Sequence, residues 1–229
     1  MTIVYKSNSI TITKNKKNDF VLSYDNDNYK HFWDNTISQL ESYKQSQTKT
    51  QKQAFFNAYS VEPLTDLLKI KKNQLSYRHA MLLFLCIGDQ LNYLEKDKYS
   101  ILTFNLKNIV IINSNADRND SILLYLNTKH FYPIKDNQIE INTPFDKKNL
   151  FLSPELKSIN SLPSNVSITS SYYSIAFLIS FCLNNSIIKT NKTFQDFLNH
   201  LTFIRDTKIY FSLIRCLDDD PKNRFYLFI

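Results

Sequence analysis

Glycine is nearly absent from this chain: Gly88 is the single glycine among 229 residues. Loops that hold nucleotide phosphates bring the backbone close to the anion, which requires residues without a Cβ atom. Walker loops, dinucleotide-binding fingerprints and the glycine-rich loops that cover ATP each need several glycines close together. The sequence therefore excludes these phosphate loops. We expect no ATP binding and no other cofactor.

Cysteine and histidine are scarce as well. The three cysteines lie far apart in apolar runs, no CxxC pair occurs, and the four histidines are isolated from the cysteines and from one another. Zinc sites and disulfide frameworks need such residues at close, regular spacings. We therefore expect no metal site and only reduced, buried thiols. The residues concerned are Cys86, Cys182, Cys216, His31, His79, His130 and His200.

Long apolar runs are also missing. The first residues of the chain lack the apolar core of a signal peptide. The longest apolar stretch, about 172–183, is too short and too often interrupted by serine to cross a membrane. We therefore expect an intracellular, cytoplasmic protein with no membrane contact.

The chain is basic, but its net charge alone does not indicate that it binds nucleic acid. Lysine and arginine number 28 against 21 acidic residues, which gives a formal charge of +7. Few of the basic residues are arginines, and arginine is the side chain best suited to recognise phosphates and bases. Lysine groups at 14–17 and 69–72 are more typical of solvated turns than of a nucleic-acid surface. Nucleic-acid binding stays open only as an alternative.

Apolar periodicity predicts strands near the start of the chain. An alternating pattern at 9–13 and again at 19–24 predicts a β-hairpin. The spacing of apolar residues over about 28–44 predicts a helix. The segment that follows, 42–53, is polar and of low complexity, which is typical of a surface loop or a frayed helix end.

From residue 54 onward we expect helices to dominate. Ser76 is a suitable N-cap for a helix with one apolar face, residues 172–179 predict a helix buried on all sides, and about 207–217 predict an amphipathic helix. The apolar face of the first of these consists of Ala80, Leu83, Phe84, Ile87, Leu91 and Leu94. Short strands are expected at 109–112, 122–126 and 139–141. Few strands followed by many helices indicate an α+β fold.

Five stretches, taken in order, resemble the eukaryotic-type protein kinase fold in a degenerate form. Residues 59–68 look like the hinge and the short helix after it, and 90–95 like the end of the long helix before the catalytic loop. Ser153-Pro154-Glu155 stands where kinases carry Ala-Pro-Glu. Residues 171–176 stand where the central buried helix begins, and 220–224 resemble the Asp-Pro-x-x-Arg motif before the last helix.

The resemblance covers about residues 54–229 and implies a bilobal kinase-like fold. The expected parts are a reduced β-containing N-lobe, residues 1–58, and a mainly helical C-lobe, residues 59–229. Each stretch alone also fits a simpler interpretation; Ser153-Pro154-Glu155, for example, fits a proline turn before an acidic helix start. The order of the five stretches is what favours the family.

The family's chemistry is degenerate at every position that the resemblance assigns. An ungapped count puts Thr103 on the catalytic aspartate, and threonine cannot act as a base near neutral pH. The same count puts Asn108 on the metal-binding asparagine and Asn127 in the Asp-Phe-Gly motif, where no aspartate is left. No lysine can be assigned to the ATP-binding lysine. Ser171 replaces the aspartate that opens the central helix and anchors the catalytic loop. We therefore assign no catalytic residue, no cofactor-binding residue and no metal ligand.

One structural pair of the family is kept. The resemblance implies that Glu155 pairs with Arg224, and we predict a partly buried salt bridge between them. Removal of one partner would leave an uncompensated charge, which costs roughly 3–5 kcal/mol when the pair is buried.

A chain that keeps structural residues of the kinase fold but lacks the catalytic residues is typical of a pseudokinase. The leading hypothesis is therefore a catalytically inactive kinase-like domain that acts as a scaffold for an unknown protein partner, with exposed aromatic side chains as anchors. The alternatives are an atypical active serine/threonine kinase with relocated acids, Asp97 or Asp117, and a lysine-rich nucleic-acid-binding module.

Residues 151–155 and 207–224 resemble a divergent group of kinase-like proteins from large nucleocytoplasmic DNA viruses. A composition rich in Asn, Lys and Ile suits an AT-rich genome. This resemblance implies the host cytoplasm or the virion as the place of action.

Overall fold

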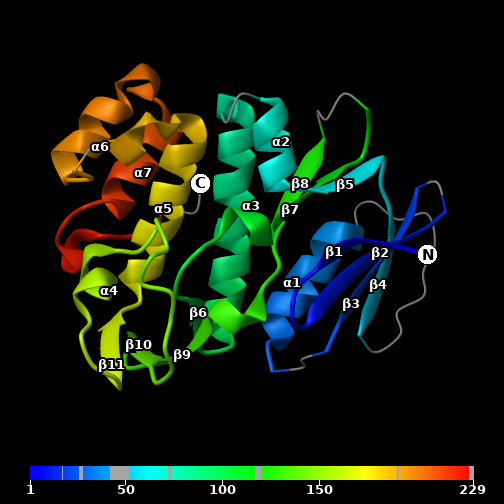
Figure 1. Cartoon of the computed structure of the whole chain (residues 1–229), viewed down its shortest axis with the longest axis horizontal. Coiled ribbons are helices and arrows are strands. Elements are labelled where there is room, and N and C mark those ends of the chain that lie inside the picture. The colour runs from blue at the N-terminus through cyan, green and yellow to red at the C-terminus, as the bar shows by residue number, and fades with distance from the viewer. Residues whose placement is uncertain are drawn as a thin grey trace.

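The computed structural model describes residues 1–16, 18–25, 28–41, 52–71, 74–116, 120–189 and 191–226. These residues form an α+β structure in which every strand pairing is antiparallel. Figure 1 shows the sheet of β1 to β4 at one end, the helices α5, α6 and α7 at the other, and the long helix α3 between them. The α+β class agrees with the sequence prediction.

The N-terminal sheet is built from four strands in the order β1-β2-β3-β4. The predicted hairpin is confirmed as β2 and β3, whose alternating residues Ile12 and Leu22 are fully buried. The sequence did not indicate the two edge strands, β1 and β4. The bounds are Thr2–Lys6 for β1, Ile10–Lys16 for β2, Asp19–Tyr24 for β3 and Gln53–Asn57 for β4.

Helix α1 (Lys30–Glu41) lies between this sheet and helix α3 (Tyr77–Lys96). Trp33 of α1 stacks on Tyr24 of β3, with ring centroids 4.3 Å apart. The predicted helix is therefore confirmed over 30–41. Of the polar segment at 42–53, residues 42–51 lie outside the described residues.

A second sheet has the order β5-β7-β8 and packs on α3. Ser76 caps α3 as predicted, because its hydroxyl accepts a hydrogen bond from the His79 backbone N–H at 3.3 Å. The predicted apolar face of α3 is buried. The other elements of this region are β5 (Ser60–Pro63), α2 (Leu64–Ile70), β7 (Ile109–Asn113) and β8 (Ser121–Tyr125).

The third sheet has the order β11-β10-β9-β6. Its strands are β6 (Tyr99–Ile101), β9 (Phe131–Lys135), β10 (Gln138–Ile141) and β11 (Ser164–Ser167). Only β10 was predicted. Helices do not dominate from residue 54 onward as strongly as expected, because β4, β6, β9 and β11 are short or polar strands whose pairing depends on distant partners.

The remaining helices are α4 (Pro154–Ser158), α5 (Thr169–Leu183), α6 (Phe194–His200) and α7 (Lys208–Cys216). The prediction of a helix buried on all sides is confirmed in α5, where only Thr169, Tyr172 and Phe181 are less than fully buried. Short 3-10 turns are η1 (Leu106–Asn108), η2 (Thr128–His130), η3 (Asn185–Lys189), η4 (Thr202–Ile204) and η5 (Pro221–Asn223). Within the described ranges, no helix has both the length and the hydropathy needed to cross a bilayer.

The apolar core is continuous across the boundary between residues 58 and 59. Trp33 belongs to the same cluster of buried side chains as Cys216 near the C-terminus. Phe32 of α1 packs edge-on against Phe131 of β9, with ring centroids 5.0 Å apart. The Tyr5 hydroxyl donates to the Leu126 carbonyl at 2.5 Å. The first 58 residues therefore share one core with the later elements.

The single glycine has a packing role inside α3. A Cβ atom on Gly88 would lie 2.5 Å from the ring of Tyr226. That ring stacks on Phe84, with centroids 4.4 Å apart, and its hydroxyl donates to the Phe84 carbonyl at 2.5 Å. The chain near residue 226 is thereby fixed to α3, and only glycine leaves the space for it.

Candidate functional site

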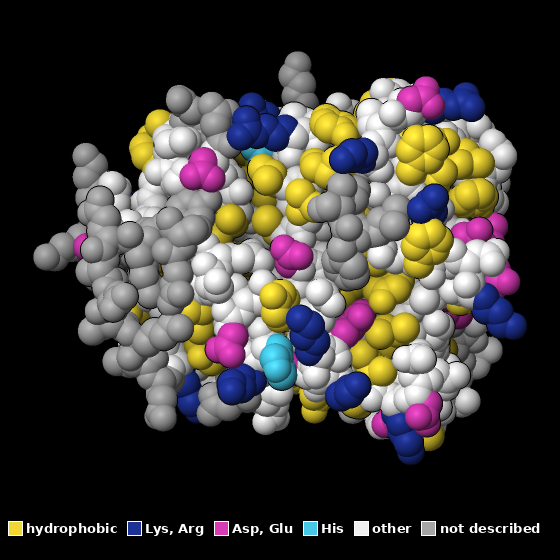
Figure 2. Space-filling model, turned by 180° about the vertical axis from the view of Figure 1, so that it is seen from behind, with side chains coloured by type: hydrophobic (Ala, Val, Ile, Leu, Met, Phe, Trp, Pro, Cys, Tyr) yellow, Lys and Arg dark blue, Asp and Glu magenta, His cyan; other side chains and the backbone are white. Residues whose placement is uncertain are grey.

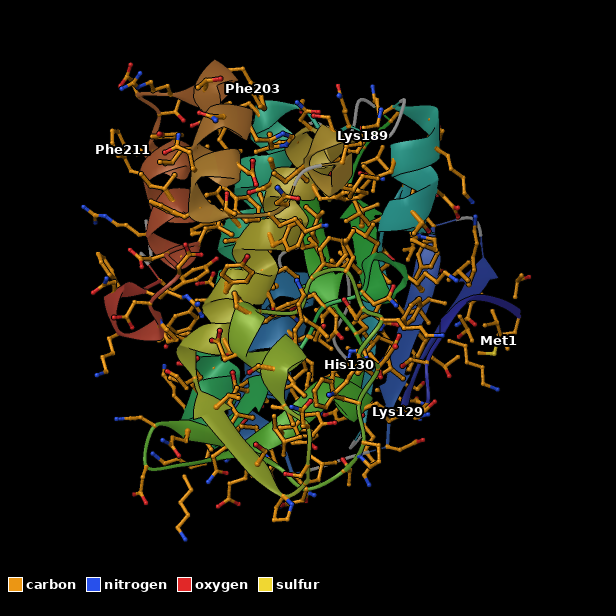
Figure 3. The ribbon with its side chains drawn as sticks, turned by 60° about the vertical axis from the view of Figure 1, so that its left-hand side comes forward. Met1, Lys129, His130, Lys189, Phe203 and Phe211 are labelled. Carbon is orange, nitrogen blue, oxygen red and sulfur yellow. The ribbon has the colours of Figure 1, made fainter. Side chains whose placement is uncertain are left out.

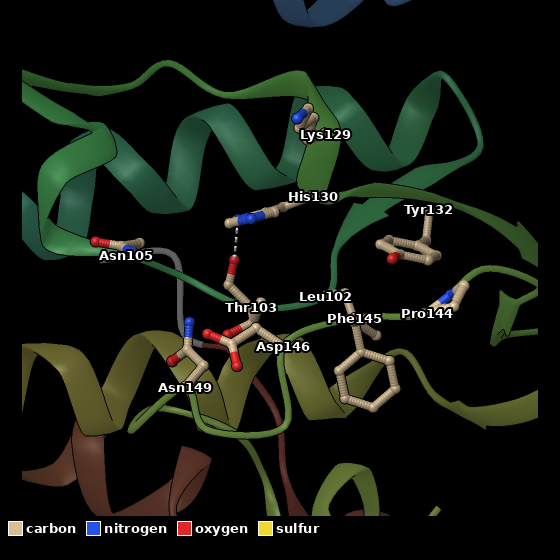
Figure 4. A pocket seen from close by; sticks show the side chains of 10 residues that line it. All are labelled: Leu102, Thr103, Asn105, Lys129, His130, Tyr132, Pro144, Phe145, Asp146 and Asn149. Carbon is tan, nitrogen blue, oxygen red and sulfur yellow. Dashed lines mark hydrogen bonds between the residues drawn. The ribbon is translucent and has the colours of Figure 1, made fainter. Parts of the chain in front are cut away.

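A cavity of about 200 Å³ lies beside Thr103 (Figure 4). Its walls come from the segment after β6, from η2 and β9, and from the loop between β10 and α4. The lining residues are Leu102, Thr103, Asn105, Lys129, His130, Tyr132, Pro144, Phe145, Asp146 and Asn149.

Thr103 is held by its backbone rather than by its side chain. The neighbouring Leu102 N–H donates to the His130 carbonyl at 2.9 Å, which ties this segment to η2. The Thr103 carbonyl lies 3.1 Å from His130 Nδ1 and accepts from the Tyr125 hydroxyl at 3.4 Å. Thr103 is 2% exposed, and its hydroxyl has no hydrogen-bond partner among the described residues.

Burial controls the protonation of the two rings behind Thr103. The Tyr125 hydroxyl and His130 Nδ1 are 2.5 Å apart. Burial lowers the pKa of His130, and the nearby Lys129 ammonium lowers it further. Burial also raises the pKa of Tyr125 well above its usual value. Near neutral pH we therefore expect an uncharged imidazole and a protonated phenol.

Asp146 contributes a carboxylate to the cavity that the sequence did not indicate. It is an exposed residue of the loop before α4, and its Oδ1 accepts from the Lys148 backbone N–H at 2.9 Å. Its charge acts on His130 in the direction that raises the imidazole pKa, although burial outweighs this effect. Asn149 holds the same loop in place, because its side-chain amide donates to the Phe104 carbonyl at 2.9 Å.

The other two predicted counterparts do not line this cavity. The Asn108 side chain lies near the Tyr125 hydroxyl, and the Asn108 backbone carbonyl accepts from the Leu126 N–H at 2.8 Å. The Asn127 side chain caps η2 by accepting from the Lys129 N–H at 3.1 Å. Thr103, Asn108 and Asn127 therefore lie in neighbouring segments, but only Thr103 faces the cavity. In the described part of the chain, no group of three or more His, Cys, Asp or Glu residues could hold a metal ion.

Of the two acids considered for relocated catalysis, Asp97 has a structural role. Its Oδ1 accepts from the His31 N–H at 3.1 Å and its Oδ2 from the Phe32 N–H at 2.9 Å, so both oxygens hold the start of α1. Its Oδ1 also lies 2.6 Å from His31 Nδ1. Asp117 lies outside the described residues.

The predicted salt bridge between Glu155 and Arg224 is present. Arg224 Nη1 lies 2.5 Å from Glu155 Oε1, the arginine side chain is fully buried, and that of Glu155 is 21% exposed. Burial alone would raise the pKa of Glu155, but hydrogen bonds from Arg224 and from Ser170 outweigh burial and lower it. The guanidinium also lies over the Tyr173 ring, 4.8 Å from its centroid.

Every nitrogen of the Arg224 guanidinium is engaged. Nη2 reaches Glu155 Oε2 at 3.3 Å and the Asp219 carbonyl at 3.1 Å, and Nε donates to the Asp218 carbonyl at 2.6 Å. The pair therefore ties α4 to the turn before η5.

Ser171 links the start of α5 to β6. Its hydroxyl lies 2.8 Å from that of Ser100, and both serines are fully buried. Ser100 is three residues before Thr103, so this hydrogen bond fixes the strand that leads into the cavity wall.

A second, apolar groove of about 390 Å³ adjoins the cavity and shares Pro144 and Phe145 with it. The Lys147 ammonium donates to the Ile159 carbonyl at its edge. The remaining lining residues are Asn160, Ser161 and Leu162.

A scan against protein-family models gives no match to this chain, and a search of curated proteins finds no significant relative. Function is therefore inferred from the residues and their geometry.

Proposed function

We propose that this chain is a kinase-like domain that has lost phosphoryl transfer and acts by binding a protein partner. The observation that carries the proposal is the state of Thr103, which the resemblance aligns with the catalytic aspartate. Its hydroxyl is buried and hydrogen-bonds to no carboxylate among the described residues. A threonine hydroxyl cannot accept a substrate proton near neutral pH.

The order of the elements supports the relation to kinases. The short helix α2 follows β5, the long helix α3 precedes the Thr103 segment, and the buried helix α5 begins near Ser171. The salt bridge between Glu155 and Arg224 joins two of the resembling motifs across 69 residues of sequence. These features agree with what the resemblance requires and do not follow from composition.

The environment of the two asparagines supports the loss of activity. Phosphoryl transfer depends on positioned phosphates and on metal-borne neutralisation of charge. The Asn127 side chain caps η2, and that of Asn108 lies near the Tyr125 hydroxyl. Neither side chain carries the negative charge with which an aspartate would attract a divalent cation.

The second candidate function is that of an active kinase with a relocated catalytic acid. The position of Asp146 favours it. This carboxylate lines the same cavity as Thr103. Asp97 is a poorer candidate, because both of its oxygens hold the start of α1.

Magnesium-ATP separates the two candidates. Thermal stabilisation and incorporation of labelled phosphate would be measured on the wild type and on the Asp146→Asn and Asp136→Asn variants. Asp136 is a matched control, because it is an exposed aspartate outside the cavity, at a positive φ that asparagine tolerates. We expect no stabilisation and no phosphate incorporation by any of the three proteins. Incorporation that is lost only in Asp146→Asn would overturn the proposal in favour of an active kinase, and incorporation by all three would overturn it as well.

A further inference from the structure

Three phenylalanines near the C-terminus are exposed on one end of the molecule. Phe203 of η4 is 57% exposed, Phe211 of α7 is 46% exposed and Phe225 is 45% exposed. Figure 3 shows Phe203 and Phe211 on the same side of the molecule, well away from His130. Figure 2 shows apolar side chains gathered at the upper right, over the end that carries α6 and α7.

Helix α7 carries part of this surface on one of its faces. Lys208, Phe211 and Arg215 are exposed, and their spacing of three and four residues places them on one face of the helix. The opposite face is buried through Ile209, Leu213 and Cys216, and it packs on α5.

Arg215 extends the row beyond the helix. Its guanidinium lies 4.9 Å from the centroid of the Phe225 ring, so the aromatic and basic groups alternate along one line. We call the residues Phe211, Arg215 and Phe225, with Lys208 and Phe203 at the end nearest η4, the α7 stripe.

The charges of the α7 stripe are positive and are not neutralised by the described residues. Neither Lys208 nor Arg215 has a carboxylate within ion-pair distance there. The nearest acids in the sequence lie beyond the two ends of α7, at Asp206 and at 218–220. Two of these, Asp218 and Asp220, already accept hydrogen bonds from backbone N–H groups of their own turn.

We infer that the α7 stripe binds an acidic, amphipathic segment of a partner protein. Exposed aromatic rings combined with arginine are the composition of protein interfaces, and contiguous exposed apolar surface on a folded domain marks such sites. Lys208 and Arg215 form no ion pair with the described residues, so their charges favour carboxylates on the partner. A second copy of this chain would bring like charges together, because the net charge is +7. This inference rests on the proposed function, since it names the kind of partner and the surface that binds it.

The test uses two synthetic peptides of equal length and helical periodicity, one built from Leu and Glu and the other from Leu and Lys. Binding to the full chain is followed by fluorescence anisotropy at low salt and at physiological salt. We expect the Leu/Glu peptide to bind, the Leu/Lys peptide to bind at least about tenfold more weakly, and the affinity for the Leu/Glu peptide to fall as salt rises.

Two substitutions test whether the Leu/Glu peptide binds at the α7 stripe. Phe211→Ala should weaken binding of the Leu/Glu peptide about tenfold, and Arg215→Glu should weaken it by a similar or larger factor. The control is Tyr59→Ala. It removes an aromatic side chain that is 54% exposed and lies directly before β5, outside the α7 stripe. It should leave binding unchanged, and equal melting temperatures show that the variants fold.

Four results would overturn the inference: no binding of the Leu/Glu peptide, equal binding of both peptides, binding insensitive to Phe211→Ala and Arg215→Glu, or a stable dimer that Phe211→Ala dissociates. The last result would make a second copy the occupant. None of them decides whether the chain transfers phosphate, because only the magnesium-ATP experiment does.

Discussion

The Glu155–Arg224 pair and the Thr103 cavity differ in how their buried polar groups are hydrogen-bonded. Arg224 is fully buried, yet each of its guanidinium nitrogens has a hydrogen-bond acceptor. Thr103 is almost as deeply buried, yet its hydroxyl has no partner among the described residues. Arg224, which connects distant segments, has a partner for each guanidinium nitrogen, whereas no described residue hydrogen-bonds to the Thr103 hydroxyl.

Two partly buried carboxylates differ in a similar way. Glu155 has a cation beside it, and its pKa is lowered. Glu95 at the end of α3 has none among the described residues. Its Oε2 accepts from the Tyr172 hydroxyl at 3.3 Å, and its Oε1 has no partner there. Burial raises the pKa of Glu95 to about 7.

The largest effect is expected for Arg224→Ala. The substitution leaves the Glu155 carboxylate without its cation, so the free energy of unfolding should fall by about 3–5 kcal/mol. Urea unfolding measures the change. The control is Arg205→Ala, which removes an exposed arginine and should change stability by less than about 0.5 kcal/mol. Equal effects of the two substitutions would show that the pair adds no stability.

A smaller effect, dependent on pH, is expected for Glu95→Gln. Because the folded-state pKa of Glu95 is raised from 4.5 to about 7, its contribution to stability is complete below pH 4.5 and is lost as the pH rises through 7. Glutamine cannot ionise, so Glu95→Gln should exceed the unfolding free energy of the wild type by less than about 1 kcal/mol near pH 5 and by up to about 3 kcal/mol at pH 8.

Urea unfolding of both proteins from pH 5 to pH 8 tests this prediction. His130 and His200, whose pKa values burial lowers, act in the opposite direction but are present in both proteins, so the difference isolates Glu95. Glu155 should show the opposite pH dependence. Because its pKa is lowered, its contribution to stability is lost as the pH falls below 4.5. A difference that stays constant over this range would contradict the assignment of Glu95.

The smallest effect is expected for Thr103→Val. Valine keeps the shape and removes a buried hydroxyl that has no partner among the described residues, so stability should be unchanged or rise by about 1 kcal/mol. Ser171→Ala is the contrasting substitution, because it leaves the hydroxyl of Ser100 unpaired and should cost about 1–2 kcal/mol. Thermal unfolding measures both. A loss of stability in Thr103→Val as large as in Ser171→Ala would show that the Thr103 hydroxyl has a partner in solution.

The elements that could be predicted are those whose signal is local. The helices α3 and α7 carry clear apolar periodicity and N-cap residues, Ser76 and Thr207, that accept backbone hydrogen bonds. The strands β1, β6 and β11 carry no such signal. The sequence of β11, Ser-Asn-Val-Ser, is polar, and this segment becomes a strand because β10 lies beside it.

The candidate site could be predicted only in part for a related reason. Thr103 and the Glu155–Arg224 pair were found because each belongs to a stretch that resembles a motif. Asp146 and His130 belong to no motif, and they meet Thr103 only because the loop before α4 folds back on η2. Contacts between three segments that are distant in sequence depend on the tertiary structure. Local propensity and residue spacing do not predict them.

The contact between Gly88 and Tyr226 has a consequence for how the protein is made. Gly88 leaves the ribosome early, with the rest of α3, but the ring that fills the space beside it arrives 142 residues after Phe84, to which it also bonds. During synthesis α3 therefore has an open apolar slot that no earlier segment closes. A chain that stops short of residue 226 would leave this slot open to chaperones and proteases, so this part of the core is complete only after Tyr226 has been synthesised.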